Sequence, residues 1–263
     1  MIPPFLAECC EKVAEGIYVD RQFLQRFGVD PMTAFGELCS LPVHSPSKPI
    51  CLQPEVAEII PGSHKALNYR GHDLRRHKVW LQDDPESGGR LYRYTGWTWP
   101  IALATKHVAT CPKMMEVAKC INTVLPQDVH HNHWIGTLYR DGSDNIGFHS
   151  DKWGDIDPQS WVVVVKLGAA RLFEFRDPQS REVVWSERLP AGAAVFTNRP
   201  GNEALQHGVP PTLENVGMSG SLVGRCIRTV VPWDQVVKEA AKRTGSEALL
   251  PPLGPASSSK RIA

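Results

Sequence analysis

A series of short apolar segments, separated by turn residues, fills the second half of this chain and constrains its fold more than any other feature. Glycine, proline, asparagine and aspartate divide the segments at fairly regular intervals, which is typical of β-strands joined by turns. The candidate strands cover residues 131–140, 161–169, 171–177, 182–189, 192–198 and 224–233. This pattern favours an all-β sandwich or barrel over alternating β-α-β units.

The chain on either side of this stretch adds further strands and helices. Residues 78–82 and 90–96 are two more candidate strands. Residues 111–125 carry apolar side chains at helical spacing, and residues 234–243 have the composition of a terminal helix. We therefore expect a mainly β fold of the α+β class, with flanking helices.

Composition divides the chain into three parts. Residues 1–62 carry helix-spaced apolar residues and then a proline-rich stretch, so they are interpreted as a helical N-terminal extension. The principal domain is expected over residues 63–245. Residues 246–263, which include "PPLGPASSSKRIA", have the composition of a disordered tail.

Composition also narrows the class of protein. Of the 263 residues, 42% are hydrophobic and 22% charged, and the formal net charge is +1, so nothing in the overall balance attracts nucleic acid or an acidic membrane. The seven cysteines show no C-x-x-C spacing, which favours reduced thiols over a disulfide framework or a zinc ribbon. No segment approaches the roughly 20 apolar residues of a membrane span. We expect an intracellular protein, cytoplasmic or nuclear, with no membrane partner.

One pair of residues indicates chemistry. In "NIGFHSDKW", His149 and Asp151 are two positions apart, so strand alternation points both side chains to one face. A distant third ligand is available in His207, in "LQHGVP", just after the candidate strand 192–198. Two histidines and one carboxylate form the facial triad that holds Fe(II) and leaves open positions for substrate and oxygen. The alternative is that this H-x-D pair occurs by chance.

The order of several motifs resembles the AlkB family of Fe(II)/2-oxoglutarate dioxygenases. "LYRDGSDNIGFHSD", "VVVVKLGAARLFEFRD", "LPAGAAVFTN", "LQHGVP" and "GRCIRTVVP" follow one another within about residues 78–233. The resemblance implies a double-stranded β-helix, or jelly roll, with 2-oxoglutarate and O₂ as cosubstrates. It places Tyr139 as the tyrosine that contacts 2-oxoglutarate, and Thr137 where the family usually has an asparagine. The implied iron ligands are His149, Asp151 and His207.

The resemblance leaves the cosubstrate's arginine undecided. A guanidinium pairs well with the distal carboxylate of 2-oxoglutarate because the pairing is planar and bidentate. "RTVVP" aligns Arg228 with the family's final arginine, but the partner expected six residues earlier is Leu222. Arg225 is present instead. We expect Arg225 at the distal carboxylate and Arg228 near Asp151, and the reverse stays open.

Candidate substrate contacts lie after the H-x-D pair and near residue 95. Lys152 and Trp153 occupy positions where nucleobase-repairing members of the family usually have an acidic residue, and the next carboxylate is Asp155. Trp153 is expected either to stack on a flipped base or to pack its own loop. Tyr94 and Trp97 are candidates for the wall of a substrate pocket, although alternation along a strand would bury half of the aromatic rings there.

These features together predict an Fe(II)/2-oxoglutarate-dependent oxygenase that hydroxylates a C–H bond and releases succinate and CO₂. The family's best-known activity makes oxidative dealkylation of an alkylated base in DNA or RNA the first interpretation. Oxidation of a small molecule, such as an amino acid or a natural-product intermediate, is the alternative on the same scaffold. A degenerate binding module is the third, and the intact set of two histidines and one aspartate argues against it.

Overall fold

The computed structural model describes residues 2–40, 68–69, 72–73, 75–82, 90–92, 111–228 and 230–232. The candidate residues Tyr94 and Trp97, the expected helix 234–243 and the tail 246–263 lie outside the described residues. No helix among the described residues is long and apolar enough to cross a membrane.

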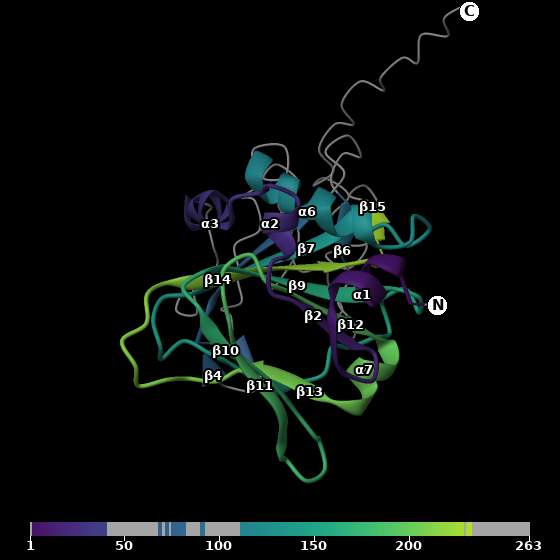
Figure 1. Cartoon of the computed structure of the whole chain (residues 1–263). Helices are drawn as coiled ribbons and strands as arrows, with labels where there is room; N and C mark the ends of the chain where they lie inside the picture. The colour runs from purple at the N-terminus through teal and green to yellow at the C-terminus, as the bar shows by residue number, and fades with distance from the viewer. Residues whose placement is uncertain are drawn as a thin grey trace, which may run out of the picture.

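Two antiparallel sheets form the body of the fold, as Figure 1 shows. The larger sheet has the strand order β1-β2-β12-β9-β14-β7-β5, and the smaller has the order β11-β10-β13-β8. Between β7 and β14 the chain passes repeatedly from one sheet to the other, except at the β10–β11 hairpin. This is the topology of a jelly roll, so the expected fold class is confirmed.

The strand bounds follow the predicted segments closely in most places. The larger sheet contains β1 (Glu11–Ala14), β2 (Ile17–Asp20), β5 (His77–Gln82), β7 (His133–Tyr139), β9 (Trp161–Gly168), β12 (Ala194–Asn198) and β14 (Ser219–Arg225). The smaller sheet contains β8 (Ile146–His149), β10 (Arg171–Arg176), β11 (Val183–Leu189) and β13 (Gln206–Val209). Two short pairs complete the set: β3 (Asn68–Tyr69) with β4 (His72–Asp73), and β6 (Arg90–Tyr92) with β15 (Val230–Pro232).

The helices of the first 40 residues and the long helix before β7 cover the outer face of the larger sheet, opposite the smaller sheet, whereas the short helix after β12 lies beside β12 and β13 (Figure 1). The helices are α1 (Pro4–Cys9), α2 (Phe23–Arg26), α3 (Pro31–Ser40), α6 (Pro112–Val124) and α7 (Arg199–Ala204). Helix α6 confirms the helix expected from the spacing of apolar residues. Leu38 and Ile121 of these helices join a buried cluster with Val163 and Val165 of β9. A second buried cluster, with Val164 and Phe173 among its members, lies between the two sheets.

The N-terminal part is only partly the helical extension that its sequence predicts, because a strand hairpin lies between helices α1 and α2. Residues 11–20 form the hairpin β1–β2, and β2 pairs with β12, so this segment extends the larger sheet. The turn depends on Gly16, whose φ is +70°. A Cβ added to Gly16 would lie 2.0 Å from Asn198 Oδ1, so a bulkier residue does not fit there. Helical spacing was misleading here because pairing with β12 outweighs local preference.

The strand expected near the end of the jelly roll was only partly predicted. The sequence predicts one strand over residues 224–233; the structure instead has β14 over Ser219–Arg225, between β9 and β7, and the short β15 over Val230–Pro232. The glycines of β14 are residues typical of turns. In the structure they allow close packing on the face of the sheet that the helices cover. A Cβ on Gly224 would lie 2.3 Å from the ring of Trp134. The shift decides which side chains of this strand face the space between the sheets.

Candidate active site

Strands β8 and β13 place two histidines next to each other. His149 ends β8 and is the cross-strand neighbour of His207 in β13. Their ring centroids are 4.4 Å apart. Asp151 is the second residue after β8, and its Oδ2 atom lies 3.9 Å from Nε2 of His207. The structure therefore brings together the three residues that the sequence singled out as candidate metal ligands.

Asp151 is held by contacts from two other elements. Arg225, the last residue of β14, contacts Oδ1 of Asp151 through a terminal guanidinium nitrogen at 2.5 Å, and both side chains are buried. Asn202 of α7 accepts a hydrogen bond from the backbone N–H of Asp151 at 2.7 Å and donates one to its carbonyl oxygen at 2.9 Å. The carboxylate is fixed in position before any ligand arrives.

The protonation states of the three residues suit metal binding. Burial lowers the pKa of His207 to about 3, and the neighbouring His149 adds to the shift. Burial also lowers the pKa of His149. For Asp151, burial by itself would raise the pKa, but Arg225 and the two histidines hold it below its ordinary value. At neutral pH the site presents two neutral imidazoles and one ionised carboxylate.

The orientation of each imidazole has a visible cause. Nδ1 of His149 lies 2.9 Å from the carbonyl oxygen of Gly147, which only accepts, so Nδ1 donates and Nε2 keeps its lone pair. The ring of His207 stacks on Phe173 of β10, with centroids 5.8 Å apart and planes 11° apart. Phe175 contacts the same ring at 6.1 Å. The apolar side of the site therefore holds His207 while its Nε2 atom faces Asp151.

The donor set fits a divalent metal such as Fe(II), which two histidines and one carboxylate hold on one face. No group of three or more His, Cys, Asp or Glu side chains within the described residues is already arranged to hold a metal ion. Arg225 occupies only one oxygen of the Asp151 carboxylate, Oδ1. The donor types, their charges and their adjacency fit the metal; their role as its ligands remains a proposal.

The expected cosubstrate residues are only partly together. Thr137 and Tyr139 of β7 are both buried. Arg225 lies on Asp151, where Arg228 was expected, and Arg228 is 54% exposed and sits 3.9 Å from Asp157. The cause is the position of β14, which ends at Arg225.

With Arg225 on Asp151, the six-residue spacing implied by the family resemblance leads to Ser219 rather than Leu222. Ser219 is a buried serine at the start of β14 and carries no charge. The position at which the resemblance implies a guanidinium therefore supplies only a hydroxyl in this chain.

The candidate substrate residues after Asp151 are turned toward the protein. Trp153 packs against a small buried cluster formed by Ile156, Val162 and Ile227. This is the loop-packing alternative for Trp153. Asp155 is buried, at 8% exposure. Tyr94 and Trp97 lie outside the described residues.

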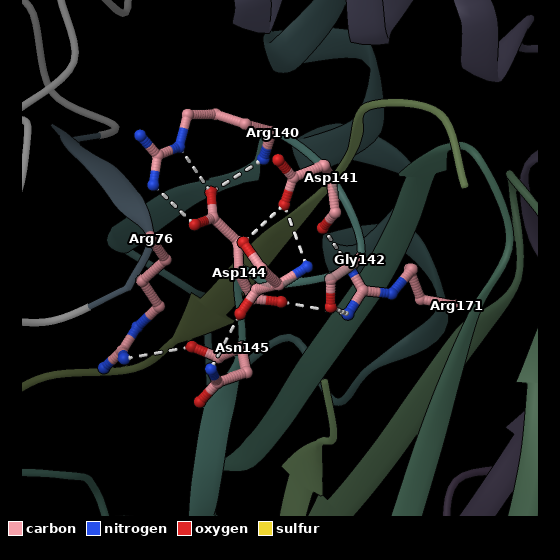
Figure 2. Close-up of polar contacts among 8 residues, drawn as sticks. Arg76, Arg140, Asp141, Gly142, Asp144, Asn145 and Arg171 are labelled. Carbon is pink, nitrogen blue, oxygen red and sulfur yellow. Dashed lines mark hydrogen bonds and ion pairs between the residues drawn. The ribbon is translucent and has the colours of Figure 1, made fainter. Parts of the chain in front are cut away.

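The loop between β7 and β8 is fixed by a polar network that Figure 2 shows. Arg171 of β10 donates to the backbone oxygens of Asp141, Gly142, Asp144 and Pro210. Within the loop, Arg140 makes a two-pronged contact with the carboxylate of Asp144. Arg171 and Arg140 are therefore occupied in holding the chain that leads into His149.

The sequence pattern of the 2OG-Fe(II) oxygenase superfamily matches residues 55–245. This chain belongs to that superfamily. The protein is therefore an oxidoreductase of the oxygenase class, and the superfamily uses Fe(II), 2-oxoglutarate and O₂. The resemblance to AlkB proteins is confirmed at the level of the family.

Two curated relatives are similar to part of this oxygenase. The human protein "DNA oxidative demethylase ALKBH2" is 35% identical over 79 residues, which are 27% of this chain and 30% of the relative. Its mouse counterpart is 34% identical over 87 residues, 30% of this chain and 36% of the relative. The chain thus spans about a third of the length of these relatives. The solved structure of OsALKBH1 gives a TM-score of 0.49 at 15% identity, covering 82% of this chain and 99% of that one.

The sequence alone did not reveal two buried polar residues of this oxygenase. Asn202 carries no recognisable motif, and its role depends on the loop that α7 brings beside Asp151. Lys166 left a signal in the sequence, because it interrupts the run "WVVVVKLG" in a strand that is buried on both faces. A charged residue in such a run is unusual and marks a position for closer attention.

Proposed function

We propose that this oxygenase removes alkyl groups from nucleobases in DNA or RNA by oxidation, using Fe(II), 2-oxoglutarate and O₂ and releasing succinate and CO₂. The observation that carries the proposal is the arrangement of His149, Asp151 and His207, with the charges a divalent metal needs, on the facing strands β8 and β13. The nucleobase as substrate class is supported by the similarity to proteins named DNA oxidative demethylase.

In this proposal His149, Asp151 and His207 hold the iron. Bound Fe(II), together with 2-oxoglutarate and O₂, supplies the oxidising chemistry at a substrate C–H bond. The protein's own contribution is positioning: Gly147 fixes the tautomer of His149, and Arg225 keeps Asp151 ionised and oriented.

The inner face of β7 serves the cosubstrate. Tyr139 and Thr137 are two positions apart and therefore share that face. Tyr139 lies opposite Ser219 of β14, and Thr137 lies opposite Ser221. Their hydroxyl groups are suited to orient 2-oxoglutarate by hydrogen bonds. When the oxidised group is an N-methyl, its hydroxylated form breaks down to formaldehyde and the free amine, which completes the demethylation.

One observation favours small-molecule oxidation as a second candidate. Trp153 packs on Ile156 and Ile227, and Asp155 is buried, so neither side chain extends freely toward a flipped base. A compact substrate that needs no stacking surface on this loop is compatible with that packing. The two candidates share the metal and the cosubstrate, and they differ only in the class of substrate.

Succinate formation across a substrate panel tests the proposal. The panel contains methylated DNA and RNA oligonucleotides, free methylated nucleosides and amino acids. Turnover with an oligonucleotide, together with binding that weakens steeply as salt rises, supports the nucleic acid substrate because phosphate contacts release counterions. Turnover confined to amino acids or other small molecules would contradict it.

The metal assignment gives the first prediction. We expect His149→Ala and Asp151→Ala each to reduce succinate formation by more than about 100-fold, because loss of a metal-binding group removes most activity. His130→Ala is the matched control, since His130 is exposed and contacts Asn122 away from the site. Circular dichroism checks that each variant is folded. Near-normal succinate release by a folded His149→Ala variant would rule out the proposed ligand set.

A further inference from the structure

A lysine lies between the two sheets of the jelly roll. Along β9, Val163 and Val165 belong to the cluster beneath the helices, whereas Val164 belongs to the cluster between the sheets. Strand alternation therefore places Lys166 on the same inner face as Val164. Lys166 is 1% exposed, which is rare for a lysine without an anionic partner.

The ammonium group of Lys166 lacks a hydrogen-bond partner among the described residues. It lies 5.7 Å from the ring centre of Tyr139 and 5.9 Å from that of Phe173, and these contacts offset only part of the cost of removing a charge from water. Burial lowers its pKa to about 8, and Arg171 contributes to the shift, so the group is still mostly protonated at neutral pH. A buried cation in this state is stabilised by an incoming anion.

Residues with hydroxyl side chains neighbour Lys166 on the inner face of the sheet. The register places Ser221 of β14 between Thr137 of β7 and Lys166 of β9. Ser219, two residues before Ser221, is fully buried, and its Oγ atom lacks a hydrogen-bond partner within the described part of the chain. We call Lys166, Ser219, Ser221 and Thr137 the lysine end of the interior. One cation and several hydroxyls form a suitable receptor for a carboxylate.

The lysine end and the candidate metal ligands share a neighbour. Phe173 stacks on His207 and also lies beneath the ammonium group of Lys166. Lys166 and His207 therefore both border one aromatic ring: the ammonium group lies 5.9 Å and the imidazole centroid 5.8 Å from its centre. The two groups thus border the same part of the space between the sheets.

The other buried cations nearby are already engaged. Arg171 donates to the backbone oxygens of Asp141, Gly142 and Asp144, which Figure 2 labels, and to that of Pro210. Arg225 pairs with Asp151. Lys78 lies on the same inner face, opposite Thr137, but the charges that act on it include Arg225 and Asp151, which places it toward the metal ligands. Arg76, also buried, donates to the backbone oxygen of Asn145 in the β7–β8 loop. Lys166 is the buried cation of the described residues whose charged group has no hydrogen-bond partner, so it remains for an anion at the opposite end.

We propose that Lys166 binds the distal carboxylate of 2-oxoglutarate, with Ser219 and Ser221 donating hydrogen bonds to the same group. This inference rests on the proposed function, because it assumes that the keto acid end of 2-oxoglutarate binds beside His149, Asp151 and His207. The anion-binding cation of this chain thus comes from β9, and the start of β14 supplies hydroxyl groups.

Calorimetric titration of the full chain loaded with Mn²⁺ tests the assignment without requiring turnover. The two ligands are 2-oxoglutarate and 2-oxopentanoate, which has the same five-carbon 2-oxo acid backbone but a methyl in place of the distal carboxylate. We expect Lys166→Met to weaken 2-oxoglutarate binding by about 10- to 100-fold, as for the loss of a charged hydrogen bond, and to leave 2-oxopentanoate binding within about twofold. Lys166→Arg keeps the charge and should lose less.

A matched control and two contrary outcomes complete the test. Lys119→Met removes an exposed lysine of α6 and should leave both affinities unchanged. Equal loss of both ligands by a folded Lys166→Met variant would show a structural role and overturn the assignment. Unchanged binding of 2-oxoglutarate by that variant would also overturn it, with the proposed function intact. A wild-type chain that binds neither ligand would contradict the proposed function itself, and the lysine's role with it.

Discussion

The two ends of the jelly-roll interior treat buried charge in opposite ways. At the metal end, formed by His149, Asp151, His207 and Arg225, the carboxylate is paired with a guanidinium at 2.5 Å. At the lysine end, the ammonium group of Lys166 has two aromatic rings beside it and no hydrogen-bonding group among the described residues. A charge that is paired inside the protein belongs to the scaffold, whereas an unpaired one indicates where a charged ligand is missing.

The sharpest test of this comparison replaces the buried cation at each end by methionine; the larger effect is expected at Arg225. Arg225→Met leaves the buried carboxylate of Asp151 without its partner, so we expect the free energy of unfolding to fall by about 3 to 5 kcal/mol in the chelator-treated chain. Urea denaturation followed by circular dichroism measures it. The double variant Arg225→Met/Asp151→Asn removes both charges and should recover a large part of the loss. A stability equal to that of the wild type in Arg225→Met would show that the pair contributes little.

The stability and the metal affinity of the metal end should also depend on Asn202, but the loss of stability should be smaller than for Arg225→Met. Asn202→Ala removes two hydrogen bonds to the backbone of Asp151 and leaves its N–H and carbonyl unsatisfied. We expect a loss of about 2 kcal/mol in the free energy of unfolding, together with weaker Mn²⁺ binding, because the carboxylate is no longer held in place. Glu203→Ala, an exposed neighbour on α7, is the control. An Asn202→Ala variant with both quantities unchanged would remove Asn202 from the site.

Much of the metal end could be predicted from the sequence. His149 and Asp151 are two positions apart, so strand alternation alone points both side chains to one face, and the distant His207 was recognisable because it follows a clear strand. The run of strands and the helix at residues 112–124 were equally readable, because their apolar residues repeat with the period of the element they form.

The lysine end could not be predicted because it depends on the pairing of β14. "SGSLVGR" resembles a turn, and only its neighbours β7 and β9 show that it is a central strand. Only this register shows that Arg225 lies on Asp151 and that Ser219 lies on the inner face. The hairpin β1–β2 was missed for the same reason, since its pairing with β12 is a contact between distant parts of the chain.

The smallest effect we expect is at Lys166 itself, and it should have the opposite sign to that at Arg225. Lys166→Met removes a buried charge without breaking a hydrogen bond, so the ligand-free variant should be more stable than the wild type by about 1 kcal/mol near pH 7. Loss of the contacts to Tyr139 and Phe173 limits the gain. Urea denaturation of both chains without ligand measures the difference, and a variant less stable than the wild type would contradict it.

The advantage of Lys166→Met should also disappear as the pH rises. The pKa of Lys166 is lowered to about 8 in the folded chain by burial, from 10.5 in the unfolded chain. Below pH 8 both states carry the charge and the folded state bears its full cost. Between about pH 8 and 10.5 the folded state releases its proton first, so wild-type stability rises toward that of the variant. Tyr139, with its pKa raised to about 12 by burial, and Arg171 face the same group and do not titrate in this interval. A stability difference that stays constant from pH 7 to 10 would show that Lys166 keeps its proton in the folded chain over this whole range, so that burial does not lower its pKa, and the contrast between the two ends would then lose its electrostatic basis.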